Sequence, residues 1–273
     1  MKIDFHTHGK LAKKLPFSEE YTKWLLNEAG KSGLDSICLT EHFNTLGFDK
    51  IYQYIIENGV REDDSFLLEG IRIFPGMETD IAEGGHILSL GPVEAILELN
   101  QKLDPYKEKG KFLPFQRLMD LFEQYPVLVG AAHPFREGSN IPKLKTEELK
   151  RLHFLDLNGK DVASECLKFE ILTKNLGNKL GKPVVGGSDT HQAVQYGCIY
   201  TEFHQSYSKI EDLYKAMCDG LYEISISDRA SYQVKTAGVL KRALKEIYHL
   251  GGDYVSVLTE EGQCACIREC AGV

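Results

Sequence analysis

Short apolar segments recur along the chain, and most of them end at histidine or acidic residues. The first ends at His6-Thr7-His8, and a later one ends at Asp189-Thr190-His191 with the same two-residue spacing. Side chains two positions apart on a strand point the same way, so each pair can chelate a divalent cation. Segments with helical periodicity lie between the apolar segments. This alternation predicts βαβ units and a parallel sheet.

Four further segments place metal-ligating residue types at a strand end. These residues are Glu41-His42 after 36–40, Glu78 after 71–77, His86 before 87–90 and His133 after 127–132. In proteins built from strand–helix units, active sites assemble at the carboxyl edge of the strands. An open sheet collects its site at one crevice, so ligands at so many strand ends favour a closed barrel.

The chain length fits one such domain. A single α/β barrel commonly takes roughly 200 to 250 residues, and the chain has 273. We therefore expect a barrel over residues 1–230, with a C-terminal helix and peripheral tail over 231–273 packed on it. A last helix is expected over 235–248, a fifth strand over 155–157, and a helix over 163–180.

Charge and hydropathy limit the kinds of partner that we expect for this chain. The chain has 32 Lys and Arg against 40 Asp and Glu, so nonspecific nucleic-acid binding is not expected, although a small phosphorylated substrate could meet a local positive site. No apolar run approaches the roughly 18 residues of a membrane span. The first strand begins at once and leaves no room for a signal peptide, which favours a cytoplasmic protein. No oligomeric state is predicted.

Local sequence signals predict where two helices begin. Ser18 is expected to cap a helix that stops near Gly33, and Ser208 with Glu211 is typical of a capping box.

Four cysteines are interpreted as buried apolar residues, namely Cys38, Cys166, Cys198 and Cys218. Cys264, Cys266 and Cys270 cluster in the tail with a spacing that matches no familiar zinc or iron–sulfur pattern.

The ordered motifs resemble those of one family. They are His6-x-His8, Thr40-Glu41-His42, Gly76-Met77-Glu78, His86, His133-Pro134 and Ser188-Asp189-Thr190-His191. Together they resemble the PHP (polymerase and histidinol phosphatase) family over roughly residues 1 to 200. The resemblance implies an α/β fold, a distorted (β/α)7 barrel of the PHP type with a short C-terminal extension. It also implies a cluster of up to three divalent ions, commonly Zn, Mn or Fe.

The resemblance assigns the ligands by position. His6, His8, Glu78 and Asp189 would hold one ion, and Glu78 would bridge to a second ion held by His86 and His133. His42 and His191 would hold a third. The loop 9–16 has no further His or Asp, so either two ions bind or the third is completed by water or Glu41.

Several neighbours are given other roles. Glu41, beside His42, is expected to point away from the site, as a structural partner. Leu157 occupies the position where the family often has a carboxylate, so Asp156 is expected to face away too. Asp4 is expected to hydrogen-bond a ligating imidazole. His153, His204 and His249 are expected to be surface or structural residues.

The resemblance implies a metal-dependent phosphoesterase that uses a metal-activated water, more a phosphomonoesterase than a diesterase. Arg136 would steady the substrate phosphate, with Arg229 and Lys14 as weaker candidates. Asp189 or His191 would carry the proton to the leaving alkoxide.

Two alternatives stay open. Amidohydrolase-like hydrolysis of an amide or lactone is one, although the sequence has no lysine at a strand end of the kind that such enzymes usually carboxylate. A noncatalytic metal-holding module is the other.

Overall fold

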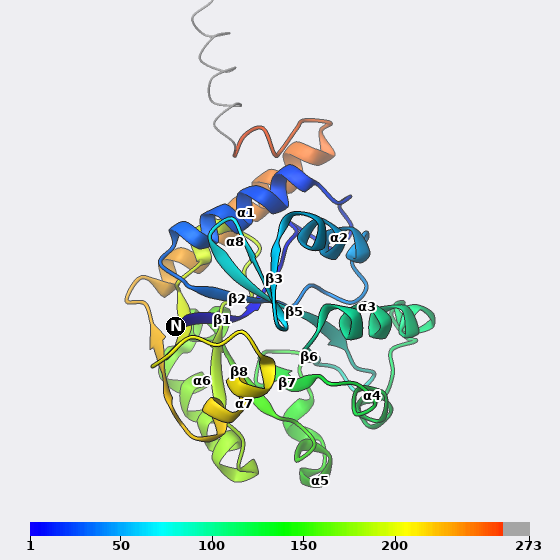
Figure 1. The fold of residues 1–273 in the computed structure, drawn as a ribbon, viewed down its shortest axis with the longest axis vertical. Coiled ribbons are helices and arrows are strands. Elements are labelled where there is room, and N and C mark those ends of the chain that lie inside the picture. Colours follow the sequence, from blue (N-terminus) through cyan, green and yellow to red (C-terminus); the bar gives the residue numbers. More distant parts are fainter. Residues whose placement is uncertain (259–273) are drawn as a thin grey trace, which may run out of the picture.

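One curved, nearly closed sheet organises residues 1–258, the part of the chain that this computed structural model describes (Figure 1). Nine strands follow one path in the order β11-β10-β1-β2-β5-β6-β7-β8-β9, and β3 and β4 form a hairpin beside β5. The strands are β1 Lys2–Thr7, β2 Ser36–Leu39, β3 Val60–Glu62, β4 Ser65–Leu68, β5 Ile71–Asp80, β6 His86–Leu90, β7 Leu128–Ala132, β8 Phe154–Asn158, β9 Val184–Gly187, β10 Ile199–Phe203 and β11 Tyr222–Ile226.

Helices surround this sheet (Figure 1). The helices are α1 Glu19–Lys31, α2 Phe48–Asn58, α3 Val93–Lys102, α4 Phe115–Phe122, α5 Thr146–Leu149, α6 Gly159–Leu180, α7 Ile210–Cys218 and α8 Ala230–His249. Short 3₁₀ turns are η1 Asp104–Tyr106, η2 Ile141–Lys143 and η3 Ala193–Gln195. The prediction of a mixed α/β, barrel-like fold is confirmed. The domain boundary near residue 230 stays a prediction.

Backbone hydrogen bonds join β1 to the segment after β9, the last strand of the path. Asp189 N donates to His6 O over 2.7 Å, and His8 N donates to Thr190 O over 3.0 Å. Thr7 and Thr190 form an isolated parallel bridge. The His-x-His motif and the Asp-x-His motif, 181 residues apart in sequence, therefore lie side by side because this seam joins the end of β1 to the chain after β9.

The expectation of a parallel sheet is wrong for several strands. β4, β10 and β11 pair antiparallel with their neighbours, and β6 pairs antiparallel with both β5 and β7. Its first residue, His86, faces Asp80 at the end of β5 in the register. Because the strand runs in reverse, its beginning lies at the edge where the neighbouring strands carry their ligands.

Of the two helix caps predicted from local signals, the structure has one. Ser18 caps α1 as predicted, with its side chain accepting from Tyr21 N at 3.1 Å. The predicted capping box at 208–211 is wrong, because Ser208 donates to Asp63. Asp64, in the turn between β3 and β4, instead accepts from the first amide of α7 at 3.0 Å. A tertiary contact thus replaces a local one.

The core contains two clusters of buried apolar side chains, one of which includes Ile3 and Phe5 of β1. Cys38 and Cys198 are buried as predicted, whereas Cys166 and Cys218 are exposed, so that interpretation was wrong for the helical pair. The tail cysteines Cys264, Cys266 and Cys270 lie outside the described residues. Among those residues, no helix is long and apolar enough to cross a membrane.

Candidate metal centre

Three overlapping groups of side chains bring metal-ligating atoms within 4.8 Å of one another at the seam of the barrel. These groups are His8, His42 and His191; His6, His8 and Asp189; and His6, Glu78 and His133. All of these predicted ligands are therefore neighbours in space. His86, the eighth, lies beside two of them, with Nδ1 2.6 Å from Glu78 Oε1 and 3.3 Å from His133 Nε2.

Glu78 lies at the middle of the cluster. Its Oε2 is 2.6 Å from Nδ1 of His42 and 3.5 Å from Nε2 of His6, and its Oε1 is 3.1 Å from Nε2 of His133. Burial alone would raise the pKa of this carboxyl, but the surrounding imidazoles hold it well below its usual range. Each carboxylate oxygen thus faces a different set of imidazoles, as a carboxylate shared between two ions requires.

The donor atoms fit a divalent ion. His6 Nε2 and Glu78 Oε2 are buried, and neither makes a contact with hydrogen-bond geometry within residues 1–258, an arrangement that is costly unless something else satisfies them. Their separation of 3.5 Å is close to the edge of a tetrahedron with metal–ligand bonds of about 2.1 Å, roughly 3.4 Å. Imidazole and carboxylate are ligands of Zn, Mn and Fe. The residues present therefore suit such an ion.

Asp156 faces the site, contrary to the sequence expectation. Its Oδ2 lies 2.9 Å from Nδ1 of His6 and accepts from the backbone amide of His133 at 3.3 Å. The contact leaves Nε2 of His6 directed at Glu78. A carboxylate behind a ligating histidine fixes the tautomer and the ring plane. Asp156 lies opposite Val185 in the pairing of β8 with β9, and no local pattern in the sequence reveals this register.

Asp189 uses its two oxygens differently. Oδ1 lies 3.1 Å from Nε2 of His8, whereas Oδ2 pairs with Arg136 Nη1 at 2.7 Å and Lys160 Nζ at 2.9 Å. Burial would raise the pKa of this carboxyl, but Lys160, Arg136 and His6 hold it well below its usual range. Its backbone adopts φ of 55°, a left-handed conformation that aspartate tolerates better than most residues. Asp189 is therefore an ionised carboxylate with one oxygen left for the imidazoles.

Arg136 lies at the site but is fully engaged. Beyond Asp189, its Nε donates to Asp161 Oδ1 at 2.9 Å and its Nη2 to Asn158 Oδ1 at 2.6 Å. Asn158 also caps α6, since its side chain accepts from Lys160 N. The guanidinium thus ties Asp189 to the start of α6.

His42 and His191 form the third ligand group together with His8, which the resemblance had assigned to the first ion. The His8 ring stacks on both, with centroids 4.1 Å from His191 and 4.3 Å from His42. His191 Nδ1 lies 2.7 Å from the carbonyl oxygen of Lys10, so its Nε2 is the nitrogen free to ligate. The loop 9–16 therefore contributes a backbone carbonyl here, and His8 supplies a third imidazole.

Two acidic neighbours differ from their expected roles. Glu41 points into the site, because it follows β2 instead of lying on it. Its Oε1 is 3.6 Å from Nδ1 of His8, and its Oε2 accepts from Gly9 N at 3.1 Å. Asp4 contacts backbone and not an imidazole, since its Oδ1 accepts from the amides of His6 at 3.1 Å and Ser188 at 2.8 Å. Asp4 therefore holds the seam together.

Other candidates lie apart from the cluster or were missed. Arg229, Lys14, His204 and His249 are exposed, and His153 Nδ1 accepts from Val129 N as a structural residue. Asp80 was missed, although its Oδ1 is 3.0 Å from Nε2 of His86; its place at the end of the predicted strand leading to Glu78 was the available signal. Lys160 was missed because nothing local links it to Asp189.

The sequence of the chain matches two protein-family models. A model of the PHP domain matches residues 4–158, and a model described as PHP-associated matches residues 174–220. The first match includes His6, His8, Glu78 and His133. No curated protein matches the chain.

Solved structures share the fold at low sequence identity. PsfC from Pseudomonas syringae is 22% identical with a TM-score of 0.71, covering 89% of this chain and 98% of its own. The lesion-specific endonuclease Q from Pyrococcus furiosus is 16% identical with a TM-score of 0.58, covering 82% of this chain and 57% of its own. An amidohydrolase from Chromobacterium violaceum is 13% identical with a TM-score of 0.52, covering 83% and 98%. The present chain thus spans little more than half of the endonuclease.

Proposed function

We propose that this chain, which belongs to the PHP domain family and is a metal-dependent hydrolase, hydrolyses a small phosphate monoester. The observation that carries the proposal is the shared carboxylate of Glu78 amid the imidazoles, beside an Asp189 neutralised by two cations. Ligands of this kind suit a closely spaced group of ions, and the adjacent cations suit an anionic substrate.

We propose the ligand assignment that the family resemblance implies, with His8 added to the third group because its ring nitrogen lies near those of His42 and His191. His6, His8, Glu78 and Asp189 would hold one ion, Glu78, His86 and His133 a second, and His42 and His191 with His8 a third. The proposed ions are two or three Zn, Mn or Fe. When bound, such ions lower the pKa of a water from 15.7 to roughly 7 and neutralise charge on the phosphoryl oxygens.

The protein's own groups orient this chemistry. Asp156 fixes the His6 ring, and Arg136 holds the Asp189 carboxylate through Oδ2 while Oδ1 faces His8. With its guanidinium nitrogens so engaged, Arg136 is better described as a positioning residue than as the main phosphate contact. Asp189 and His191 stay the candidates for proton transfer to the leaving alkoxide. The ion pairs of Asp189 favour its ionised form, which can accept a proton from water before handing it on.

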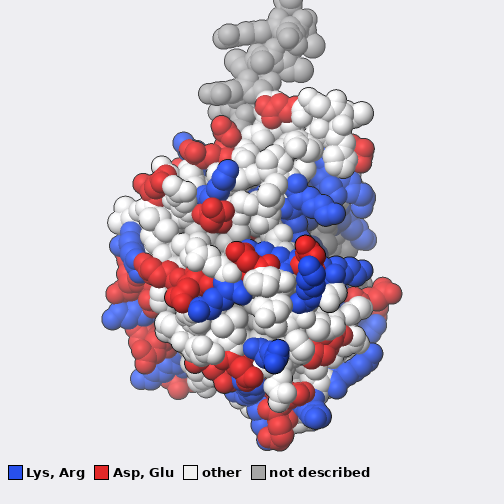
Figure 2. Space-filling view, turned by 90° about the vertical axis from the view of Figure 1, so that its right-hand side faces the viewer, with Lys and Arg blue, Asp and Glu red and all other residues white. Residues whose placement is uncertain are grey.

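Two alternatives are less well supported. Amide or lactone hydrolysis of the amidohydrolase kind usually involves a carboxylated lysine, whereas the lysine at this centre, Lys160, pairs with Asp189 Oδ2 through its ammonium. Nucleic acid is the substrate of the endonuclease Q neighbour, whose complex holds a 27-mer duplex with an abasic lesion. On the face of the present chain shown in Figure 2, acidic and basic side chains are interspersed, whereas tracking a phosphate backbone favours a basic band.

A substrate panel with the metal-loaded protein tests the proposal. We expect turnover of p-nitrophenyl phosphate, with less or none of bis-p-nitrophenyl phosphate, a lactone set and an abasic-site duplex. His133→Ala should abolish turnover and reduce bound metal, whereas His204→Ala, which changes an exposed histidine, should do neither. Hydrolysis of the lactones or the duplex without the monoester would refute it, and so would metal binding with no turnover of any ester.

A further inference from the structure

Lys160 is the cation at the metal centre with freedom to change partner. Among residues 1–258 its ammonium makes one ion pair, with Asp189 Oδ2, and its side chain is 34% exposed. Arg136 already pairs with the same oxygen and is additionally held by Asp161. Asp189 therefore keeps a counter-ion when Lys160 turns to another anion, so that exchange leaves no buried carboxylate unpaired.

A second lysine approaches the same place from α8. The barrel-facing stripe of this helix contains Gln233, Ala237 and Leu244, and Lys241 falls on it at a spacing of four from Ala237. Gln233 Nε2 donates to the carbonyl oxygens of Val194 and Tyr196 at 3.3 and 3.0 Å. These bonds fasten the stripe to η3, which begins two residues after His191.

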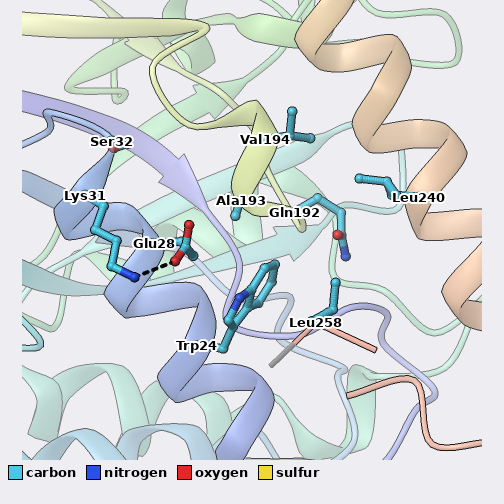
Figure 3. A pocket seen from close by; sticks show the side chains of 9 residues that line it. All are labelled: Trp24, Glu28, Lys31, Ser32, Gln192, Ala193, Val194, Leu240 and Leu258. Carbon is cyan, nitrogen blue, oxygen red and sulfur yellow. Dashed lines mark hydrogen bonds and ion pairs between the residues drawn. The ribbon is translucent and has the colours of Figure 1, made fainter. Parts of the chain in front are cut away.

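A cavity lined by residues of α1, η3 and α8 lies next to the segment that follows His191 (Figure 3). It has a volume of about 380 Å³, and its lining includes Leu240 of α8, Val194 of η3 and Gln192, the residue after His191 (Figure 3). α8 also packs against α6, the helix that carries Lys160. These contacts place α8 against both η3 and α6, and Lys241 lies on the stripe of α8 that contacts η3.

The electrostatics of Lys241 agree with that placement. Burial, and next the charge of Lys160, lower its pKa to about 8, while Asp189 and Glu41 act in the opposite direction. Within residues 1–258, Asp189 pairs with Lys160 and Arg136 and forms no ion pair with Lys241. A half-buried ammonium whose charge is opposed by a second ammonium is stabilised further when an anion binds to both.

We propose that Lys160 and Lys241 form an anion subsite that binds the phosphoryl oxygens of the substrate and selects a phosphomonoester dianion over a diester monoanion. This inference rests on the proposed function and names the residues that set its specificity. A monoester carries about −1.5 to −2 charge near neutral pH, and a diester carries one charge. Both lysines lie outside the family matches at 4–158 and 174–220, so motif reading alone passes over them.

The test measures binding before turnover. Inorganic phosphate is titrated calorimetrically into the metal-loaded wild type and into Lys160→Gln, Lys241→Gln and the double variant. Because charge-assisted hydrogen bonds are lost, each single change should weaken phosphate binding by about 10-fold, and the double change by more. Lys235→Gln, an exposed lysine on α8, should bind as the wild type does. Lys160→Arg and Lys241→Arg, which keep the charge, should recover most of the affinity.

Steady-state kinetics measure the preference for monoesters over diesters that the two lysines are proposed to set. For p-nitrophenyl phosphate the Gln variants should raise KM about 10-fold with kcat nearly unchanged, and for bis-p-nitrophenyl phosphate KM should change less than about 3-fold. Bound metal is measured in every variant. Equal phosphate affinity in all variants overturns the subsite, and so does loss of metal together with phosphate, because the lysines would then act on Asp189 alone. If phosphate binding depends on both lysines but no phosphate ester is hydrolysed, the subsite stands and the proposed function fails.

Discussion

Nδ1 of His6 lies 2.9 Å from Oδ2 of Asp156, across 150 residues of sequence, and both side chains are fully buried. The contact decides which nitrogen of His6 faces the cluster. It also ties β1 to β8 beneath the proposed ions.

Replacing Asp156 by asparagine should weaken metal binding without unfolding the protein. The amide preserves the shape of the side chain but removes the charge that holds the His6 tautomer, and such changes cost about 10- to 100-fold in metal affinity. Competition with a chromogenic chelator measures the affinity. Glu147→Gln, which alters an exposed carboxylate on α5, is the matched control. An Asp156→Asn protein with wild-type metal affinity would contradict the role given to this pair.

Asp189→Asn should abolish hydrolysis and reduce bound metal while retaining the fold. Asparagine tolerates the φ of 55° at this position, whereas Asp189→Ala adds backbone strain. Both changes leave Arg136 and Lys160 short of a counter-ion, and we expect about 1–3 kcal/mol lower free energy of unfolding because both cations are partly solvated. Denaturant unfolding and metal analysis check these outcomes. Full activity in either variant would show that the site is wrongly assigned.

Removing metal with a chelator should abolish hydrolysis, and adding back Zn, Mn or Fe should restore it. The number of ions tests the third group. If His42, His191 and His8 hold an ion, the wild type binds three per chain, and His42→Ala binds one fewer. Two ions in the wild type, with the same number in His42→Ala, would mean that this group is empty. Metal analysis after desalting provides the count.

Asp4 should make the stability of the metal-free protein depend on pH. Burial raises its pKa from 3.8 to about 7, against the hydrogen bonds from Ser188 and His6. The folded state then binds the proton more tightly than the unfolded state, so this contribution is complete below pH 3.8 and is lost as the pH rises to about 7. The loss is at most about 4 kcal/mol.

Asp4→Asn isolates that contribution. Its amide oxygen can accept the same two backbone hydrogen bonds, so the variant should gain stability relative to wild type progressively from pH 4 to 7. Urea unfolding of both proteins at several pH values measures the difference. A constant difference across that range would show that Asp4 does not titrate there.

Local signals determined much of this protein. The alternation of apolar strands with capped helices predicted the α/β barrel, and Ser18 caps α1 as its position implied. The predicted ligand side chains converge because each follows or precedes a short strand, and strand ends of a barrel meet at one edge. These inferences needed only the period of the apolar pattern and the residue type at its end.

Tertiary structure decided the rest. The reversal of β6, the inward positions of Glu41 and Asp156, and the contact of Lys160 with Asp189 all depend on how distant segments pair. A shift of one residue in strand register turns a side chain to the opposite face, and register is set by partners far away in sequence. The sequence by itself therefore determined which residues form the cluster, and the folded sheet determined which atoms face each other within it.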